Sequence, residues 1–439
     1  MRDFARFLAE HRQLTRRYLI KLGAGGLALG KLGSRFALAD PATENAAAGA
    51  ATAAEPTVAP PALPALGDGV KKIESLLTPQ KLFYDVSRGD PLPHSLPEEK
   101  KREVGLTRDT WQLEVISDPE HPVPLRNAMT KEKSRAFRFD DLMKLAEKHA
   151  VRFAKAMTCL NLGCPLGLGI WEGVPLREVI WLTEPRDNCR RVFYYGYHND
   201  QPEQIFRSSL PIGRVFEDPY DLPPVILCYK LNGEWLTPER GGPVRIVVPE
   251  GYGFKSIKWL SHVVLSESPY ANDTYAEQGN DIDSPMKTFA ATIDPPTEVA
   301  AGAKIPVAGY AQVGISGLSK VQAWIQPAGE RLAGGDRYFS NAPWVDMEIL
   351  PPPTNWGGDF PDGKIPSPTL GFDPATGQPN TWPLRLAMVH WAGVLPGLPA
   401  GKYTLRCRAV DEKGIAQPMP RPFRKSGHAA IEQISVVVK

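Results

Sequence analysis

The sequence predicts an α+β protein, with a mixed α+β domain over residues 81–285 and an antiparallel β-sandwich over residues 286–439. Helix-like and strand-like apolar spacings alternate up to residue 285, whereas short alternating strands separated by turn residues follow. A segment rich in alanine and proline precedes both parts. Because 439 residues exceed what one compact core needs, we expect two or three domains.

Residues 1–39 have the order of an export signal. A basic pair, Arg16 and Arg17, precedes a short glycine-rich apolar segment that ends at the small-x-small site "ALA". The run "TRRYLIK" resembles the twin-arginine export consensus. We therefore expect export to the periplasm. Because that route carries folded proteins, often with a cofactor already inserted, export also suggests that the protein holds a cofactor. The alternative is an amphipathic first helix with a chance arginine pair.

Residues 40–80 begin with an alanine- and proline-rich run that has almost no charge, which is typical of a flexible linker. The formal net charge of +2 gives no reason to expect a nucleic-acid partner. No apolar run reaches the roughly 18 residues that span a bilayer, so no transmembrane segment is expected in the mature chain.

The first domain carries one strong hairpin signal. In "VILCYKLNGEWL", residues 225–236, a strand is followed by an Asn-Gly turn and the start of a return strand. Apolar residues at Leu142, Leu145 and Val151 predict a helix over 139–154. Further strands are expected at "WQLEVI", "FAKAMTC", "RRVFYYGY" and "PVRIVVPEG", and a short helix at "REVIWL".

The second domain shows the strand spacing of an immunoglobulin-like sandwich. A proline-rich insertion over 341–383, which holds several tryptophans, is expected to be a surface excursion. The strands are expected at "TFAATIDPP", "KIPVAGYAQV", "SKVQAWIQ", "GKYTLRCRAVDEKG" and "AIEQISVVV".

Two of the five cysteines, Cys159 and Cys164, lie close together in "MTCLNLGCPLGLGIWEGVPL". From the spacing alone they are a disulfide, a redox pair, part of a metal site or buried packing residues. There is no CxxC motif, so a c-type haem lacks its attachment site and no haem is expected. A thiolate that a loop presents at a strand end is well placed to ligate a metal, which favours Cys159.

Residues 225–260, "VILCYKLNGEWLTPERGGPVRIVVPEGYGFKSIKWL", resemble the signature of the sulfite oxidase family of molybdopterin enzymes, which includes sulfane dehydrogenase-like members. That signature has the form "AYxMNGxPLxxxHGxPxRxxVPGxxGxxxVKWL" and surrounds the pterin. Cys159 precedes "WEGVPL" as the family's metal-ligating cysteine precedes its "WxGVPL" segment. The second half, with "GYAQVGISGLSKVQAWI", is similar to the family's dimerisation domain, so the likeness covers roughly residues 83–439.

The resemblance implies a molybdenum–molybdopterin cofactor with Cys159 as the metal ligand. A pterin that bears a phosphate needs cations and N–H groups around the anion. Without the resemblance, the same charges would be solvated strand ends. The residues that the resemblance places at the cofactor are Arg88, His198, Arg240, Arg245, Lys255, Ser256 and Lys258.

The chain departs from the family at the expected substrate site. The family reads "CAGNRR" at the metal-ligating cysteine, whereas this chain reads "CLNLGC" and lacks the arginine. At the position of the family's active-site tyrosine stands Gly279 or Asn280, with Tyr275 out of register. We therefore expect Asn161 and Asn280 to contact the substrate, and Arg424 or Lys425 to be a cation that reaches the site from the second domain.

The cysteine loop is expected to be apolar, from Leu160 to Ile170, which predicts weak sulfite oxidation and a less charged or bulkier substrate. The sequence as a whole predicts an exported oxidoreductase that performs two-electron oxygen-atom transfer on a small sulfur-containing or related substrate. By resemblance, we expect a homodimer and a separate electron carrier such as a c-type cytochrome. The alternatives are a catalytically impaired cofactor-binding subunit of a redox complex and a binding protein whose cysteine loop is structural.

Overall fold

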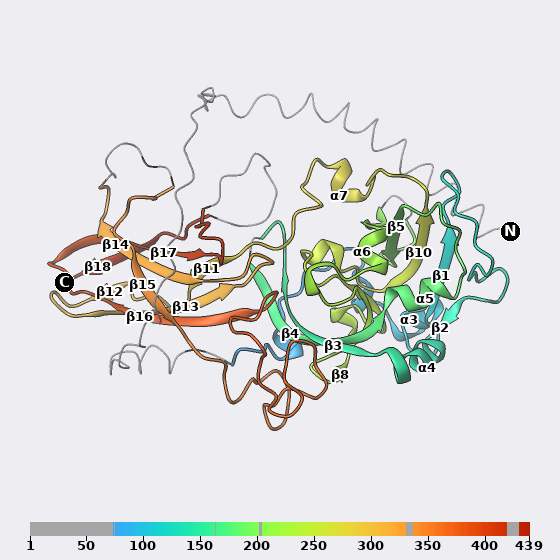
Figure 1. Ribbon diagram of the computed structural model, residues 1–439, viewed down its shortest axis with the longest axis horizontal. Helices are drawn as coiled ribbons and strands as arrows, with labels where there is room; N and C mark the ends of the chain where they lie inside the picture. The colour runs from blue at the N-terminus through green and yellow to red at the C-terminus, as the bar shows by residue number, and fades with distance from the viewer. Residues whose placement is uncertain are drawn as a thin grey trace. The chain divides into compact units, whose positions relative to one another are not determined.

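The computed structural model describes residues 73, 75–162, 164–201, 204–330, 336, 338–418 and 430–439 (Figure 1). The expected export signal, most of the linker, and Arg424 and Lys425 lie outside these residues. Every helix in the described part is too short or too polar to cross a membrane. From residue 75 onward, the described residues belong to one compact unit, and the boundary expected at residue 285 stays a prediction.

One sheet of the N-terminal half has the strand order β2-β1-β10-β5-β6. Its central pair, β1 and β10, is parallel and the other pairs are antiparallel. Apolar side chains on one face of this sheet enter the largest core of the molecule. The strands are β1 (Gln112–Ser117), β2 (Phe137–Arg138), β5 (Arg191–Gly196), β6 (Arg207–Pro211) and β10 (Leu260–Ser266).

The second sheet has the order β3-β4-β7-β8, with β9 paired to β7. The Asn-Gly hairpin joins β7 to β8 as predicted, with positive φ at Asn232 and Gly233. The strands are β3 (Val151–Thr158), β4 (Pro165–Pro175), β7 (Ile226–Leu231), β8 (Glu234–Trp235) and β9 (Arg245–Val247).

The helices around these sheets are short. Helix α4 (Phe139–His149) ends sooner than its apolar spacing predicts, because Ala150 is extended and Val151 begins β3, which pairs with β4. The other α-helices are α3 (Glu98–Glu103), α5 (Leu176–Trp181), α6 (Ile212–Phe216) and α7 (Thr274–Glu277). The 3₁₀ helices are η1 (Gln80–Leu82), η2 (Pro93–Ser95), η4 (Pro219–Asp221), η5 (Pro238–Arg240) and η6 (Gly253–Lys255).

The described residues after 288 contain strands and no helix, as predicted. They form a sheet of order β11-β13-β16-β15-β14-β17-β18-β12, and strands from both halves of it share one core around Trp391 and Leu405. Strand β15 pairs with both β14 and β16 and so joins the two halves. The strands are β11 (Phe289–Thr292), β12 (Glu298–Val299), β13 (Ile305–Gln312), β14 (Lys320–Pro327), β15 (Val345–Ile349), β16 (Met388–Leu395), β17 (Gly401–Val410) and β18 (Ile434–Val438).

The insertion over 341–383 is not the surface excursion that its composition suggests. Trp356 is only 2% exposed and packs in one cluster with Leu168 and Ile170 of β4. The amide of Leu370 donates to the carbonyl of Arg152 in β3 at 2.8 Å. Because β4 begins at Pro165, the cysteine loop is also shorter than expected, and Leu168 and Ile170 pack under the insertion instead of forming an apolar rim.

Candidate functional site

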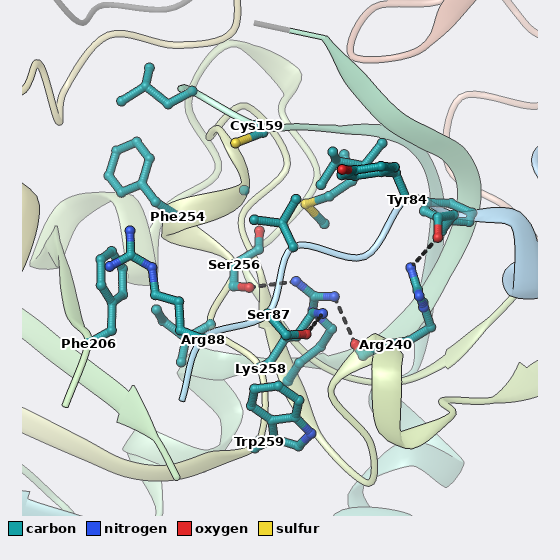
Figure 2. A pocket seen from close by; sticks show the side chains of 18 of the residues that line it. Tyr84, Ser87, Arg88, Cys159, Phe206, Arg240, Phe254, Ser256, Lys258 and Trp259 are labelled. Carbon is teal, nitrogen blue, oxygen red and sulfur yellow. Dashed lines mark hydrogen bonds between the residues drawn. The ribbon is translucent and has the colours of Figure 1, made fainter. Parts of the chain in front are cut away.

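A pocket with about 930 Å³ of atom-free volume, part of it open to solvent, lies where segments from several parts of the first 275 residues meet (Figure 2). The segments are 83–88, the end of β3 with the loop after it, β4, 240–259, residues beside β5 and β6, and Tyr275 of α7. Eight of the ten predicted site residues line it: Arg88, Cys159, Asn161, His198, Arg240, Arg245, Ser256 and Lys258.

Cys159 follows the last residue of β3 and borders the pocket. The hydroxyl of Thr158, the residue before it, donates to the side-chain carbonyl of Gln312 in β13. The amide nitrogen of Gln312 donates in turn to the carbonyl of Lys287 at 2.7 Å. A strand of the C-terminal half therefore fixes the backbone that presents the Cys159 thiol.

Arg240 and Arg245 are buried in the floor of the pocket. Arg240 donates to the carbonyl of Phe83 at 2.8 Å, and Arg245 donates to the carbonyls of Arg240 at 2.8 Å and Ser256 at 2.6 Å (Figure 2). Burial lowers the pKa of Arg245 to about 10, so it is charged at neutral pH. Its Nε is buried and has no hydrogen-bond partner among the described residues. Such a group is costly unless a ligand pairs with it.

Lys258 adds a third cation, which is partly buried. Its ammonium donates to Asp85 at 2.7 Å, to Ser87 at 2.9 Å and to the carbonyl of Glu239 at 2.5 Å. Burial, together with the neighbouring Arg245, lowers the pKa of Lys258 to about 8, although Asp85 opposes this. With Arg88, these residues give the pocket an excess of positive charge, which suits an anion.

Tyr275 is the pocket residue that the sequence reasoning missed as a site. The phenol oxygen of Tyr275 accepts hydrogen bonds from Arg88 Nη2 and from Asn161 Nδ2, each at 2.9 Å. Its ring packs against Phe206 and Phe254, with centroids 5.0 and 4.8 Å apart. Tyr275 lies a few residues before the position that the resemblance implies for the family's tyrosine, so the resemblance did not indicate it as a site residue.

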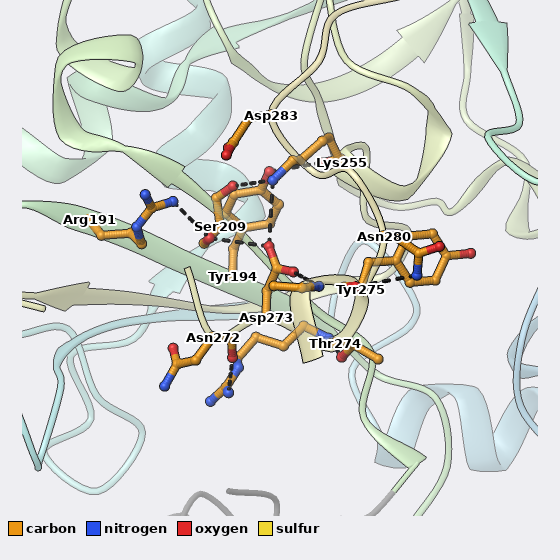
Figure 3. Close-up of polar contacts among 12 residues, drawn as sticks. Arg191, Tyr194, Ser209, Lys255, Asn272, Asp273, Thr274, Tyr275, Asn280 and Asp283 are labelled. Atoms are coloured by element: carbon orange, nitrogen blue, oxygen red, sulfur yellow. Dashed lines mark hydrogen bonds and ion pairs between the residues drawn. The ribbon is translucent and has the colours of Figure 1, made fainter. Parts of the chain in front are cut away.

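Asn280 and Lys255 are not among the residues that line the pocket. Their polar contacts lie around α7 (Figure 3), and their expected roles stay predictions. The amide of Asn280 donates to the backbone carbonyl of Tyr275 at 3.2 Å. Lys255 Nζ donates to the carbonyl of Ser209 at 2.8 Å and lies 3.5 Å from Asp273, which caps α7. Both side chains therefore contact the segment around α7, the helix that carries Tyr275.

His198 borders the pocket without adding charge to it. Burial, with a smaller contribution from Arg88, lowers the pKa of His198 to about 4 against the hydrogen bond with the Gly196 carbonyl. The imidazole is therefore neutral at physiological pH and can take part in hydrogen bonding and ring packing only.

The residues present fit a molybdenum–molybdopterin group. Cys159 offers a thiol at the pocket, and a thiolate is a metal ligand that proteins supply to redox centres. Three cations are available for a phosphate: Arg240, Arg245 and Lys258. The Nε–H of Arg245, which has no partner among the described residues, is free to donate a hydrogen bond to it.

Comparison with known proteins agrees with this chemistry. Residues 106–274 match the family model "Oxidoreductase molybdopterin binding domain". The chain is 28% identical over 213 residues to the NADPH nitrate reductase of Neurospora crassa, covering 45% of this chain and 21% of that protein. It is 26% identical over 221 residues to the mitochondrial sulfite oxidase of Drosophila melanogaster, covering 47% of this chain and 34% of that protein. The chain thus spans about a fifth to a third of these relatives.

Among solved structures, the sulfane dehydrogenase SoxCD from Paracoccus pantotrophus matches with a TM-score of 0.54. The match covers 84% of this chain and 85% of that chain at 15% sequence identity. Likeness at this identity is a likeness of fold. It extends through both halves of the described chain, so the β-rich C-terminal half belongs to the shared architecture.

Proposed function

Because the chain belongs to the sulfite oxidase-like family of molybdopterin-dependent oxidoreductases, we propose that it is a molybdenum enzyme that transfers an oxygen atom, with two electrons, to or from a small sulfur compound. The observation that carries the proposal is the meeting of Cys159, Tyr275 and Arg88 in one pocket. The same pocket is thus lined by a thiol that can ligate a metal, a charged donor and a hydroxyl that can contact a substrate oxygen.

Cys159 would ligate the metal, and Arg240, Arg245 and Lys258 would hold the phosphate of the pterin. When bound, this group supplies a metal centre that exchanges two electrons and an oxygen atom with a substrate. The protein supplies the thiolate, the orientation of the pterin and the cationic surroundings.

The hydroxyl of Tyr275 would donate a hydrogen bond, or a proton, to an oxygen of the substrate. Its phenol oxygen already accepts two hydrogen bonds, so both lone pairs are used and the hydroxyl hydrogen is left to donate. No acceptor for that hydrogen occurs among the described residues, so a substrate oxygen in the pocket is a suitable acceptor. Arg88 and the Asn161 amide hold the phenol in place.

This arrangement changes the substrate expected from the sequence. We infer that Arg88, which donates a hydrogen bond to Tyr275, takes the place of the arginine absent from the cysteine loop, and that Tyr275 takes the role of the family's tyrosine. We therefore propose a sulfur oxyanion or an S-oxide as substrate. The expectation of weak sulfite oxidation rested partly on the absence of these two groups, and that part of its argument no longer holds under this proposal. The same two residues count against the alternative of a catalytically impaired subunit.

The setting of the enzyme is proposed from the sequence. We propose export by the twin-arginine route, electron exchange with a separate carrier such as a c-type cytochrome, and a homodimer held by an immunoglobulin-like C-terminal domain. Replacing Arg16 and Arg17 by lysine is expected to leave folded, cofactor-loaded protein in the cytoplasm. Equal periplasmic yield from this double variant would contradict that route.

Metal and pterin analysis of the natively exported protein tests the main proposal. We expect about one molybdenum per chain and a pterin without an attached nucleotide. Cys159→Ser is expected to lose the metal or its catalytic signal, because a hydroxyl ionises far less readily than a thiol. Cys164→Ser is the matched control and should keep both. Wild-type protein without molybdenum, from a molybdenum-replete host, would refute the proposal.

A substrate screen then separates an enzyme from a cofactor-binding subunit. The molybdenum-loaded protein is incubated with sulfite, thiosulfate and S-oxides, together with a dye or cytochrome as electron acceptor or donor. Turnover with one of these compounds supports the proposal. A fully loaded protein that turns over none of them favours the impaired subunit.

A further inference from the structure

The loop that carries Cys159 closes a β-hairpin, which sets the two neighbouring cysteines opposite each other. Strands β3 and β4 are antiparallel, and after a β-bulge that shifts the register beyond Met157, Thr158 pairs with Pro165 at the end of the ladder. Proline has no N–H group, so Thr158 and Pro165 cannot exchange the two backbone hydrogen bonds of a hydrogen-bonded pair. The next position outward is Cys159 opposite Cys164, and there the amide of Cys159 donates to the carbonyl of Cys164 at 3.3 Å.

Residues opposite each other in a hydrogen-bonded antiparallel pair have Cα atoms about 5.5 Å apart, with both side chains on one face. A disulfide requires Cα atoms about 4.4–6.8 Å apart. The Cβ atoms must approach somewhat more closely than in a regular ladder, and the last pair of a hairpin has the freedom to do so. Both cysteines are free thiols and both are partly exposed.

We propose that Cys159 and Cys164 form a reversible disulfide in the chain that lacks its cofactor, so that oxidation removes the metal ligand. The inference rests on the proposed function, because it takes Cys159 as that ligand. Cys164 does not line the pocket, and the proposal gives this second thiol a role. Bound metal occupies the Cys159 sulfur and protects it from the reaction.

The reaction uses a small disulfide, such as oxidised glutathione, as the oxidant. The thiolate of Cys159, which the pocket makes accessible, attacks one glutathione sulfur; this forms a mixed disulfide and expels one glutathione thiolate. The thiolate of Cys164 then attacks the Cys159 sulfur and expels the second glutathione. Two cysteine thiols are oxidised, one small disulfide is reduced to two thiols, and the two cysteine protons pass to the departing glutathiones.

As a consequence, the Cys159 thiol would be sensitive to oxidation until the cofactor is inserted. In a reducing compartment Cys159 stays available for the metal. A chain that reaches an oxidising compartment without its cofactor would be locked in a form that cannot ligate it. Loaded and unloaded chains would thus be distinguished by one bond at the site itself.

The experiment uses the full chain in two forms, purified from a host that makes the pterin cofactor and from one that does not. Each form is incubated with oxidised glutathione, alkylated and digested with trypsin. Both cysteines lie in a single tryptic peptide, Ala156–Arg177. In the cofactor-free chain we expect this peptide to lose two hydrogens in mass and to resist alkylation until dithiothreitol is added. In the loaded chain we expect no change.

The matched variant is Cys164→Ser. Because it has no second thiol to complete the exchange, it should retain a glutathione on Cys159 as a mixed disulfide. Cys189→Ser controls for the third partly exposed thiol and should behave as wild type. A second readout is molybdenum uptake from added cofactor, which should fall at least about tenfold after oxidation of the wild type and recover with dithiothreitol.

Two results would overturn the inference: a cofactor-free wild-type peptide that keeps two alkylatable thiols or carries only glutathione, or a loaded chain that forms the internal bond equally well. If no preparation contains molybdenum, the proposed function fails, while the mass change in the cofactor-free peptide still reports whether the thiols join. If molybdenum is present and the peptide never loses two hydrogens, only the disulfide proposal fails.

Discussion

The side-chain amide of Asn161 donates a hydrogen bond to the phenol oxygen of Tyr275 at 2.9 Å and so links the cysteine loop to helix α7, 114 residues further along the chain. Arg88 donates to the same oxygen from a third segment. The phenol is therefore held by the chain segment that carries Cys159, the proposed metal ligand. The position of the Tyr275 hydroxyl depends on that of the Cys159 loop.

Asn161→Ala should lower kcat more than it raises KM. The variant removes one neutral hydrogen bond, which is worth about 1 kcal/mol, or a three- to tenfold change in rate. Tyr275→Phe removes the hydroxyl itself and should cost about 10²–10⁴ in kcat if that group transfers a proton. Steady-state kinetics of both variants and of the double variant measure this.

The double variant is the informative control. If Asn161 acts through Tyr275, the effect of Asn161→Ala should vanish in the Tyr275→Phe background, because neighbours that act as a unit are not additive. Full additivity would show that Asn161 acts on the substrate by itself. The molybdenum content of each variant must equal that of the wild type.

Arg88→Gln should lower kcat/KM for an oxyanion substrate by about 10²–10³, since a charge-assisted contact to a desolvated anion is worth a few kcal/mol. The guanidinium of Arg88 also lies 4.4 Å from the centre of the Phe206 ring, so Arg88→Lys keeps the charge but loses the planar stacking. We expect the kcat/KM of Arg88→Lys to lie between that of the wild type and that of Arg88→Gln. An uncharged S-oxide tested in parallel should be much less affected, and an equal loss for both substrates would point to a structural role.

How far the sequence predicts this site depends on whether the signal is local. Cys159 at the end of β3 and the Asn232-Gly233 turn were predicted correctly because strand ends and two-residue turns have local signatures. Tyr275 was missed because its place is set by α7, whose cap Asp273 is held by Lys255, and by contact with Arg88. No local pattern encodes that contact.

The insertion over 341–383 shows the same limit for the fold. Its many prolines and turn residues are typical of a surface loop, yet Trp356 and Phe372 are buried against β3 and β4. The amino-acid composition of a segment indicates only its tendency to form a loop. Whether the segment is buried depends on the strands that it contacts, which here lie nearly 200 residues earlier in the chain. The hydrogen bond between Thr158 and Gln312 connects the two sides of the boundary expected at residue 285, which stays a prediction.

Trp356→Ala tests whether the insertion stabilises the domain. Removal of a fully buried aromatic side chain should reduce the free energy of unfolding by about 3–5 kcal/mol. Tyr270→Ala is the control, since this side chain is 75% exposed and its loss should change stability by less than about 0.5 kcal/mol. Urea unfolding followed by tryptophan fluorescence and circular dichroism measures both. Equal stability of Trp356→Ala and wild type would show that the packing of the insertion through Trp356 does not stabilise the domain.

The last prediction concerns Lys155, which is fully buried in β3 beneath the cysteine loop. Its ammonium donates to the carbonyls of Gly251 at 2.8 Å and Ala156 at 3.2 Å, and no carboxylate pairs with it among the described residues. Burial lowers the pKa of Lys155 to about 7; Glu250 opposes this shift and Arg245 adds to it.

The sign of the pH dependence follows from these two states. Between about pH 7 and pH 10 the unfolded chain binds a proton at Lys155 that the folded chain does not, so this residue makes stability rise with pH. Below pH 7 both states are protonated and the contribution is constant. Lys155→Met has no such group, so its free energy of unfolding should fall increasingly behind that of the wild type as pH rises through this window, by up to about 1.4 kcal/mol per pH unit. Urea unfolding of both proteins at pH 6, 7, 8 and 9 measures the difference, and Lys413→Met controls for the loss of an exposed lysine. A difference between wild type and Lys155→Met that stays constant from pH 7 to pH 9 would mean that Lys155 remains charged in the folded protein, with the carbonyls of Gly251 and Ala156 sufficient to stabilise the ammonium.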